Sequence, residues 1–173
     1  MKIKNLVDKT TNFLLKRISE LLGLTLLILS VLLLVSLISY SPEDPNFIFP
    51  DNTEISNLLG TKGSYTSDFL YQSIGLISLL VPFSFFFISL TVIIDKKILR
   101  IIENIFFILL YSITGTLFFT VFHTETFWLT INGNNGFVGS LFEETFFVSL
   151  ININHQISYT ILVLLILLFF LLS

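Results

Sequence analysis

LLGLTLLILSVLLLVSLIS, residues 21–39, is a charge-free apolar stretch that five basic residues precede. As an α-helix it would be about 28 Å long, close to the roughly 30 Å thickness of a bilayer's hydrocarbon core. It is longer than the apolar region of a secretory signal peptide, which has about 7–15 residues. The stretch therefore predicts an uncleaved membrane anchor.

Three further apolar stretches follow the first one along the chain. The chain is 54% hydrophobic and only 12% charged, whereas soluble domains carry about 25% charged residues. We therefore predict an all-α integral membrane protein, and Pro82 is expected to kink its second span. The predicted transmembrane helices are residues 21–39, 70–94, 105–122 and 155–172.

The charges alternate from one connection to the next. Basic residues gather in residues 1–20 and in the connection 95–104, while Lys62 is the one basic residue in the other two connections. By the positive-inside rule, both termini and 95–104 are cytoplasmic, and 40–69 and 123–154 are outer loops. The outer loops then carry a net charge near −7 and the inner segments near +4. This predicts a multi-pass membrane protein whose inner face favours anionic lipid headgroups.

The segments outside these spans leave alternatives open. Residues 1–20 fit a basic amphipathic helix on the inner leaflet, or a solvated lead-in to the first span. Phe137–Leu150 is apolar but short and contains Glu143 and Glu144, so a re-entrant or interfacial helix is favoured over a fifth span. Trp128 is expected in an aromatic belt at the outer boundary. Because Ser173 follows the last span directly, we expect a fragment whose reading frame continues.

No residue pattern in the chain predicts a catalytic, cofactor or metal site. There is no cysteine and no GxxxxGK[ST] loop. The outer loops offer possible metal ligands, but without HExxH spacing; these are His123, Glu125, Glu143, Glu144 and His155. A membrane enzyme using these residues is one alternative. A small polytopic transporter or channel subunit is the other, and it is disfavoured because the spans contain no Asp, Glu, Lys or Arg.

Four motifs, in order, resemble the amino-terminal four-span membrane domain of FtsK-type (FtsK/SpoIIIE) bacterial DNA translocases. Residues 39–45, SYSPEDP, match the segment after the first span and contain Pro42, Asp44 and Pro45. Asn57, Gly60, Gly63 and Asp68 match an N-x-x-G-x-x-G pattern followed by an acid, and Gly75 matches a glycine of the second span. Residues 135–140, NGFVGS, match the segment that contains Gly136 and Gly139. Ser64 and Asn135 depart from the usual alanine and glycine.

The resemblance implies a non-catalytic role for this region. It implies an anchor in the bacterial inner membrane that targets a DNA translocase to the division septum and takes part in cell division and chromosome partition. The partners it implies are divisome membrane proteins and further copies of the chain, as a hexamer, without direct DNA contact from this region. ATP and Mg are expected only in a cytoplasmic motor domain, which is absent from these residues. Nine of the matching residues, which we call the motif residues, are expected to have a structural or interaction role. They are Pro42, Asp44, Pro45, Asn57, Gly60, Gly63, Asp68, Gly136 and Gly139.

Overall fold

The computed structural model describes the backbone of residues 2–46, 54–123, 129 and 133–173, and side chains from residue 8 onward in these ranges. The described residues form helices and their connections, without a strand. Glu125 and Trp128 lie outside the described residues. Four helical stretches are long and apolar enough to cross a membrane: Asp8–Ile38, Gly60–Asp95, Arg100–Phe122 and His155–Leu172. The prediction of an all-α, four-span membrane protein is confirmed.

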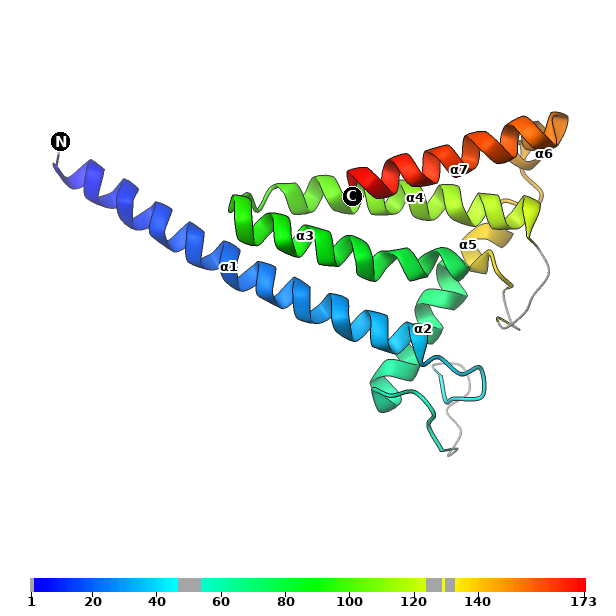
Figure 1. Ribbon diagram of the computed structural model, residues 1–173, viewed down its shortest axis with the longest axis horizontal. Coiled ribbons are helices and arrows are strands. Elements are labelled where there is room, and N and C mark those ends of the chain that lie inside the picture. Colours follow the sequence, from blue (N-terminus) through cyan, green and yellow to red (C-terminus); the bar gives the residue numbers. More distant parts are fainter. Residues whose placement is uncertain (1, 47–53, 124–128, 130–132) are drawn as a thin grey trace.

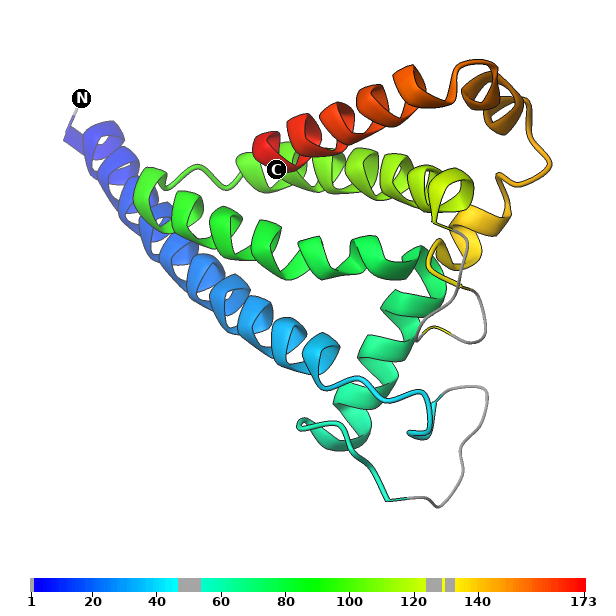
Figure 2. The same cartoon turned by 45° about the vertical axis from the view of Figure 1, so that its right-hand side comes forward.

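The spanning helices are arranged as two closely packed pairs. Helix α1 (Lys2–Ile38) packs along α3 (Val81–Asp95), and α4 (Arg100–Phe122) packs along α7 (His155–Leu172). Figures 1 and 2 show the two pairs side by side, with α3 and α4 in the middle. We call the end with the α3–α4 turn, residues 96–99, the turn end. The opposite end, with residues 39–46, 54–60 and 133–145, is the loop end.

The helix expected over residues 70–94 differs from the structure. It is divided into α2 (Gly60–Ile74), the 3₁₀ helix η1 (Gly75–Leu80) and α3. The division falls at Gly75, whose φ is +65°, and α2 then leads sharply away from α3 (Figure 1). Pro82 lies in the first turn of α3, where a missing N–H costs no hydrogen bond. The expected kink at Pro82 is therefore wrong, and α2 occupies part of the range expected to be a loop.

The second connection at the loop end contains two short helices. Helix α5 (Gly136–Ser140) has five residues and α6 (Phe146–Ile153) has eight. Thr145, between them, is extended, with ψ 158°, and Glu143 and Glu144 lie in the same break. Neither helix reaches the roughly 20 residues that a membrane crossing needs. A fifth span over Phe137–Leu150 is thereby excluded.

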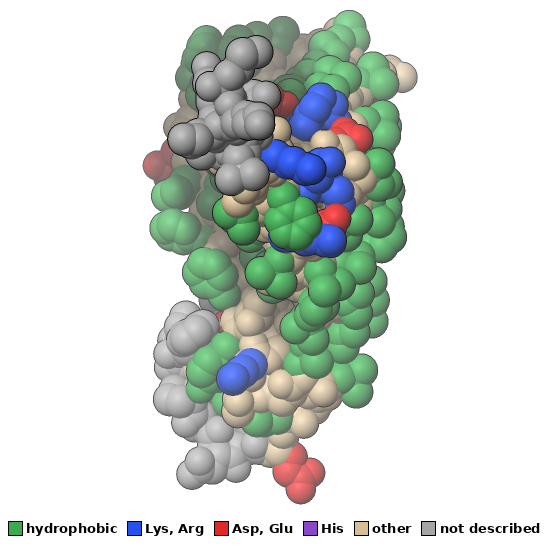
Figure 3. Space-filling model, turned by 90° about the vertical axis from the view of Figure 1, so that its left-hand side faces the viewer, with side chains coloured by type: hydrophobic (Ala, Val, Ile, Leu, Met, Phe, Trp, Pro, Cys, Tyr) green, Lys and Arg blue, Asp and Glu red, His purple; other side chains and the backbone are tan. Residues whose placement is uncertain are grey.

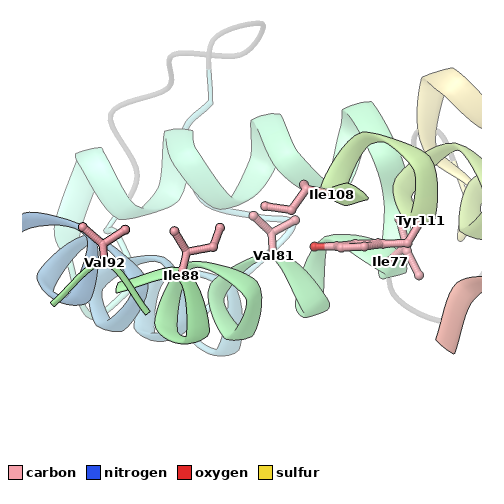
Figure 4. Packing of buried hydrophobic residues seen from close by; sticks show 6 residues of the cluster. All are labelled: Ile77, Val81, Ile88, Val92, Ile108 and Tyr111. Atoms are coloured by element: carbon pink, nitrogen blue, oxygen red, sulfur yellow. The ribbon is translucent and has the colours of Figure 1, made fainter. Parts of the chain in front are cut away.

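The apolar core lies between the two helix pairs. It is formed by Ile77 of η1, three aliphatic residues of α3, and Ile108 and Tyr111 of α4 (Figure 4). Gly115 of α4 faces Ile77 so closely that a Cβ there would lie 2.4 Å from its side chain. Small residues therefore let α4 approach η1, as in other packed membrane helices. Most other large apolar side chains point outward, as a bilayer requires.

Residues 2–20 do not form an element of their own. Helix α1 runs without interruption from Lys2 to Ile38, so the basic segment is the first part of the spanning helix. Residues 8–18 are exposed, and Ser19 is the first buried residue among those of α1 whose side chains the structure describes. In Figure 1 this part of α1 extends beyond the other helices.

Candidate functional site

The motif residues of the first connection meet in one hydrogen-bond network at the loop end. Both carboxylate oxygens of Asp44 accept bonds from backbone N–H groups, from Ser56 at 2.8 Å and from Asn57 at 2.8 Å. Asp44 and Asn57 are only 5% and 4% exposed. A buried carboxylate is tolerated when its oxygens accept such bonds. Asp44 thereby holds residues 54–57 against the end of α1.

Asn57 joins this segment to α1 and α2. Its side-chain N–H group donates to the carbonyl of Ser36 at 2.9 Å and to that of Ser39 at 3.2 Å. The last carbonyls of a helix have no partner within the helix, so the Asn57 amide caps the end of α1. Its Oδ1 faces Gly63, where an added Cβ would lie 2.0 Å away. A side chain at Gly63 would therefore displace Asn57.

Hydroxyl groups complete this network, which we call the loop-end network. The Ser36 hydroxyl of α1 donates to the Gly63 carbonyl at 2.7 Å. The Ser64 hydroxyl donates to the Pro45 carbonyl at 2.5 Å. Ser64 stands at a position where the family that the motifs resemble usually has alanine. Its hydroxyl makes a hydrogen bond that alanine cannot make. The network thus fastens α1, the first connection and α2 to one another.

Two tyrosines pack beneath the network. The rings of Tyr40 and Tyr71 lie 4.9 Å apart, and Tyr71 donates to the Leu37 carbonyl at 3.1 Å. Tyr40 donates to Oδ1 of Asp68 at 3.4 Å. Burial, together with the Asp68 charge, raises the pKa of the Tyr40 phenol far above its ordinary value. Tyr40 therefore remains a neutral hydrogen-bond donor.

The second motif segment forms a separate contact, which we call the glycine contact. The Leu76 N–H donates to the Asn134 carbonyl at 2.9 Å, directly beside Gly75. A Cβ on Gly75 would lie 2.0 Å from that carbonyl oxygen, and one on Gly136 would lie 2.5 Å from the Gly75 nitrogen. Both glycines have positive φ, +65° and +64°, which favours residues without a Cβ. The two backbones touch where α2 ends and α5 begins.

Thr120 of α4 joins the same region. Its hydroxyl shares its proton between the carbonyls of Thr116 at 2.8 Å and Gly139 at 3.1 Å, and it accepts a bond from the Asn135 amide at 3.1 Å. Asn135 replaces the usual glycine of the resemblance, and its side chain makes this bond to α4. A Cβ on Gly139 would lie 2.4 Å from the Asn135 side chain. The second connection is therefore held on α2 and α4 together.

The structure brings most of the motif residues together and buries them. Asp44, Pro45, Asn57, Gly63 and Asp68 lie at the loop-end network, and Gly136 and Gly139 at or beside the glycine contact. Gly60, half-buried with φ +64°, begins α2, while Pro42 is exposed. Sequence reasoning did not single out Ser36, Thr120 or Asn134. For Ser36, a polar residue inside an apolar span was the available signal.

The possible metal ligands do not come together in the part of the chain that the structure describes. Among them, no group of three His, Cys, Asp or Glu side chains is placed to hold a metal ion. The His155 ring packs 4.4 Å from that of Phe122, and His123 packs against Phe118. Glu143 accepts a bond of 3.4 Å from Asn135. These side chains serve as aromatic packing and loop contacts.

Comparison with known proteins agrees with the arrangement of spans and motifs. Residues 15–173 match the family model of the 4TM region of DNA translocase FtsK/SpoIIIE. The chain is similar to "DNA translocase FtsK" of Rickettsia typhi, with 41% identity over 59 residues, which is 34% of this chain and 8% of that protein. The protein of the same name from Rickettsia bellii is 46% identical over 50 residues, which is 29% of this chain and 7% of that protein.

These matches cover different shares of the chain and of its relatives. The matched segments span less than a tenth of the length of the curated relatives. No solved structure matches the chain. The family model, in contrast, covers nearly all of it, including all four spans and both motif segments. The chain belongs to the family of the 4TM region of DNA translocases FtsK/SpoIIIE.

Proposed function

We propose that this chain anchors a DNA translocase in the inner membrane and targets it to the division septum. The observation that carries the proposal is the family match over residues 15–173, together with the buried network made by the motif residues. A network that joins α1, the first connection and α2 gives the loop end a defined shape. A defined surface outside the bilayer is what recognition of other membrane proteins requires.

In this proposal the region itself is non-catalytic. ATP hydrolysis, with Mg, belongs to a cytoplasmic motor domain outside these residues, and DNA is contacted there. The helices contribute attachment to the bilayer, contacts with divisome membrane proteins and assembly with further copies, as a hexamer by resemblance. The apolar outward faces of the helices support the attachment, because they match the surrounding lipid.

The surface available to a divisome protein lies around the network rather than in it. The buried motif residues cannot touch a partner directly, whereas Leu58, beside Asn57, is 77% exposed. A partner that covers this side chain would remove its apolar surface from water, which favours association. We therefore assign Leu58 to the contact surface.

The test uses the full-length protein with a fluorescent tag in dividing cells. Enrichment at midcell is expected, and Leu58→Asp should remove it while the protein stays in the membrane at its usual level. Glu54→Ala is the matched control, because Glu54 is an exposed neighbour in the same segment, and it should leave the enrichment intact. An even distribution of the unaltered protein around the membrane would overturn the septal role.

A further inference from the structure

The turn end has a surface pocket that the anchoring role does not explain. Its volume is about 670 Å³, and it is lined by the turn residues 96–99 together with Leu15 of α1 and with Arg100 and Glu103 of α4. The turn connects two spanning helices, so the pocket lies at the depth of the lipid headgroups. The pocket therefore combines an apolar wall, formed by Leu15, Ile98 and Leu99, with a basic rim.

The turn is held in an uncommon backbone conformation. Lys96 has a φ of +58°, the one non-glycine residue with positive φ in the described part of the chain. Glycine usually occupies this position after a helix. Here, however, the Lys96 ammonium forms an ion pair with Glu20 of α1 at 2.8 Å. The Ser19 hydroxyl donates to the Leu15 carbonyl of its own helix at 2.8 Å and lies 3.4 Å from the Lys96 carbonyl. These contacts to α1 fix the shape of the pocket.

The basic side chains around the pocket outnumber the carboxylates that pair with them. Arg100 pairs with Asp95 at 3.0 Å, and Glu20 is shared between Lys96 and Arg17. Lys97 is exposed and forms no ion pair among the residues that the structure describes. Figure 3 shows Lys and Arg side chains gathered at this end of the molecule, with apolar side chains between them. The pocket lining as a whole carries three basic side chains, Lys96, Lys97 and Arg100, against the one carboxylate of Glu103, so it favours an anion.

We propose that this pocket binds an anionic phospholipid. Lys97 and Arg100 contact the phosphate group, and the acyl chains lie along Leu15 and Leu99, the latter 75% exposed. Basic pockets at the ends of membrane helices bind anionic headgroups through such charges. The occupant is a lipid rather than a soluble phosphate, because the wall of the pocket is apolar. The proposal requires that the chain is inserted in the bilayer, as in the proposed function. It does not require the septal role.

The experiment measures lipid retention by the full chain purified in a neutral detergent. Phosphatidylglycerol and phosphatidylcholine are added in equal amounts, and native mass spectrometry gives the ratio of the two bound lipids. Phosphatidylglycerol should be retained preferentially, and Lys97→Gln should lower the ratio about fivefold, as expected for the loss of one basic contact near a membrane surface. Because Lys97 pairs with no described residue, its substitution removes no ion pair that the structure shows.

Two matched variants separate a defined pocket from general attraction. Lys9→Gln removes the same charge from the exposed part of α1, outside the pocket, and Lys62→Gln removes it near the loop end. Both should leave the ratio within about twofold of the unaltered chain. If Lys9→Gln lowers it as much as Lys97→Gln, or if the two lipids bind equally well, the proposal is wrong. Localisation in cells plays no part in this measurement, so its result is independent of the septal role.

Discussion

At the scale of single residues, the motif of the first connection is a set of mutually dependent contacts. Asp44 fixes the backbone at Asn57, and the Asn57 side chain reaches the end of α1. Gly63 is required because the Asn57 oxygen occupies the space of its Cβ. The sequence could predict that these residues matter, from their pattern. It could not predict that they meet, because residues 36 and 63 are joined by a hydroxyl–carbonyl bond that no local pattern indicates.

Asn57→Ala should destabilise the loop end. It leaves the carbonyls of Ser36 and Ser39 without the amide donor that they have in the structure. A buried polar group that loses its partner costs about 1–3 kcal/mol. Thermal unfolding in detergent should show a lower midpoint. Ser56→Ala is the control, since Ser56 contributes its backbone N–H to Asp44; an equal loss in both variants would contradict the assigned role of Asn57.

Gly60 and Gly63 should respond differently to substitution. Gly60 has positive φ and open space around its Cβ position, whereas Gly63 has no space. Because asparagine tolerates positive φ better than alanine does, Gly60→Asn should be milder than Gly60→Ala. Gly63→Ala should cost about 1–3 kcal/mol as overpacking, and Gly63→Asn should be no milder. Unfolding midpoints of the four variants would show whether this order holds.

At the scale of elements, the division of the second span is the main departure from the sequence prediction. Residues 70–94 have the composition of one continuous apolar helix. The break arises from a tertiary contact, since Gly75 meets Asn134 and Gly136 from a distant part of the chain. The hydropathy of a segment indicates that it lies in lipid. It does not indicate which other part of the backbone packs against that segment. The four spans could therefore be predicted, but the position of this break could not.

Gly75→Ala should disturb this region more than Pro82→Ala does. A Cβ at Gly75 would collide with the Asn134 carbonyl oxygen, so the glycine contact would open. Pro82 lies in the first turn of α3, where alanine is compatible with the helix. Hydrogen exchange of the Leu76 amide, which donates to Asn134, should become faster in Gly75→Ala and remain slow in Pro82→Ala. Faster exchange of this amide in Pro82→Ala alone would instead support the expected kink at Pro82.

At the scale of the whole molecule, the two ends are held by different interactions. The loop end is fastened by buried hydrogen bonds between elements, and the turn end by apolar packing with an ion pair from Glu20 to Lys96. The apolar core connects the two helix pairs between these ends. Charge asymmetry in the sequence predicts that the loop end faces outward, since the basic residues lie at the other end.

Single cysteines provide a test of this orientation, because the chain has no cysteine of its own. Glu54→Cys and Ser140→Cys place thiols on exposed positions at the loop end, and Lys9→Cys and Lys97→Cys place them toward the turn end. In intact cells with a permeable outer envelope, a membrane-impermeant maleimide should label the first two variants. The other two should react only after the membrane is opened. The reverse pattern would invert the predicted topology.

The uninterrupted course of α1 has a mechanical consequence. Its 37 residues correspond to a rod of about 55 Å, roughly 25 Å more than the hydrocarbon core is thick. Since residues 8–18 are exposed in the chain, this surplus acts as a lever with its pivot near Ser19. A change in tilt of about 10° moves its far end by about 4 Å, on the basis of helix length alone. A displacement at the loop end, transmitted along a rigid α1, would thus be delivered to the opposite side of the bilayer.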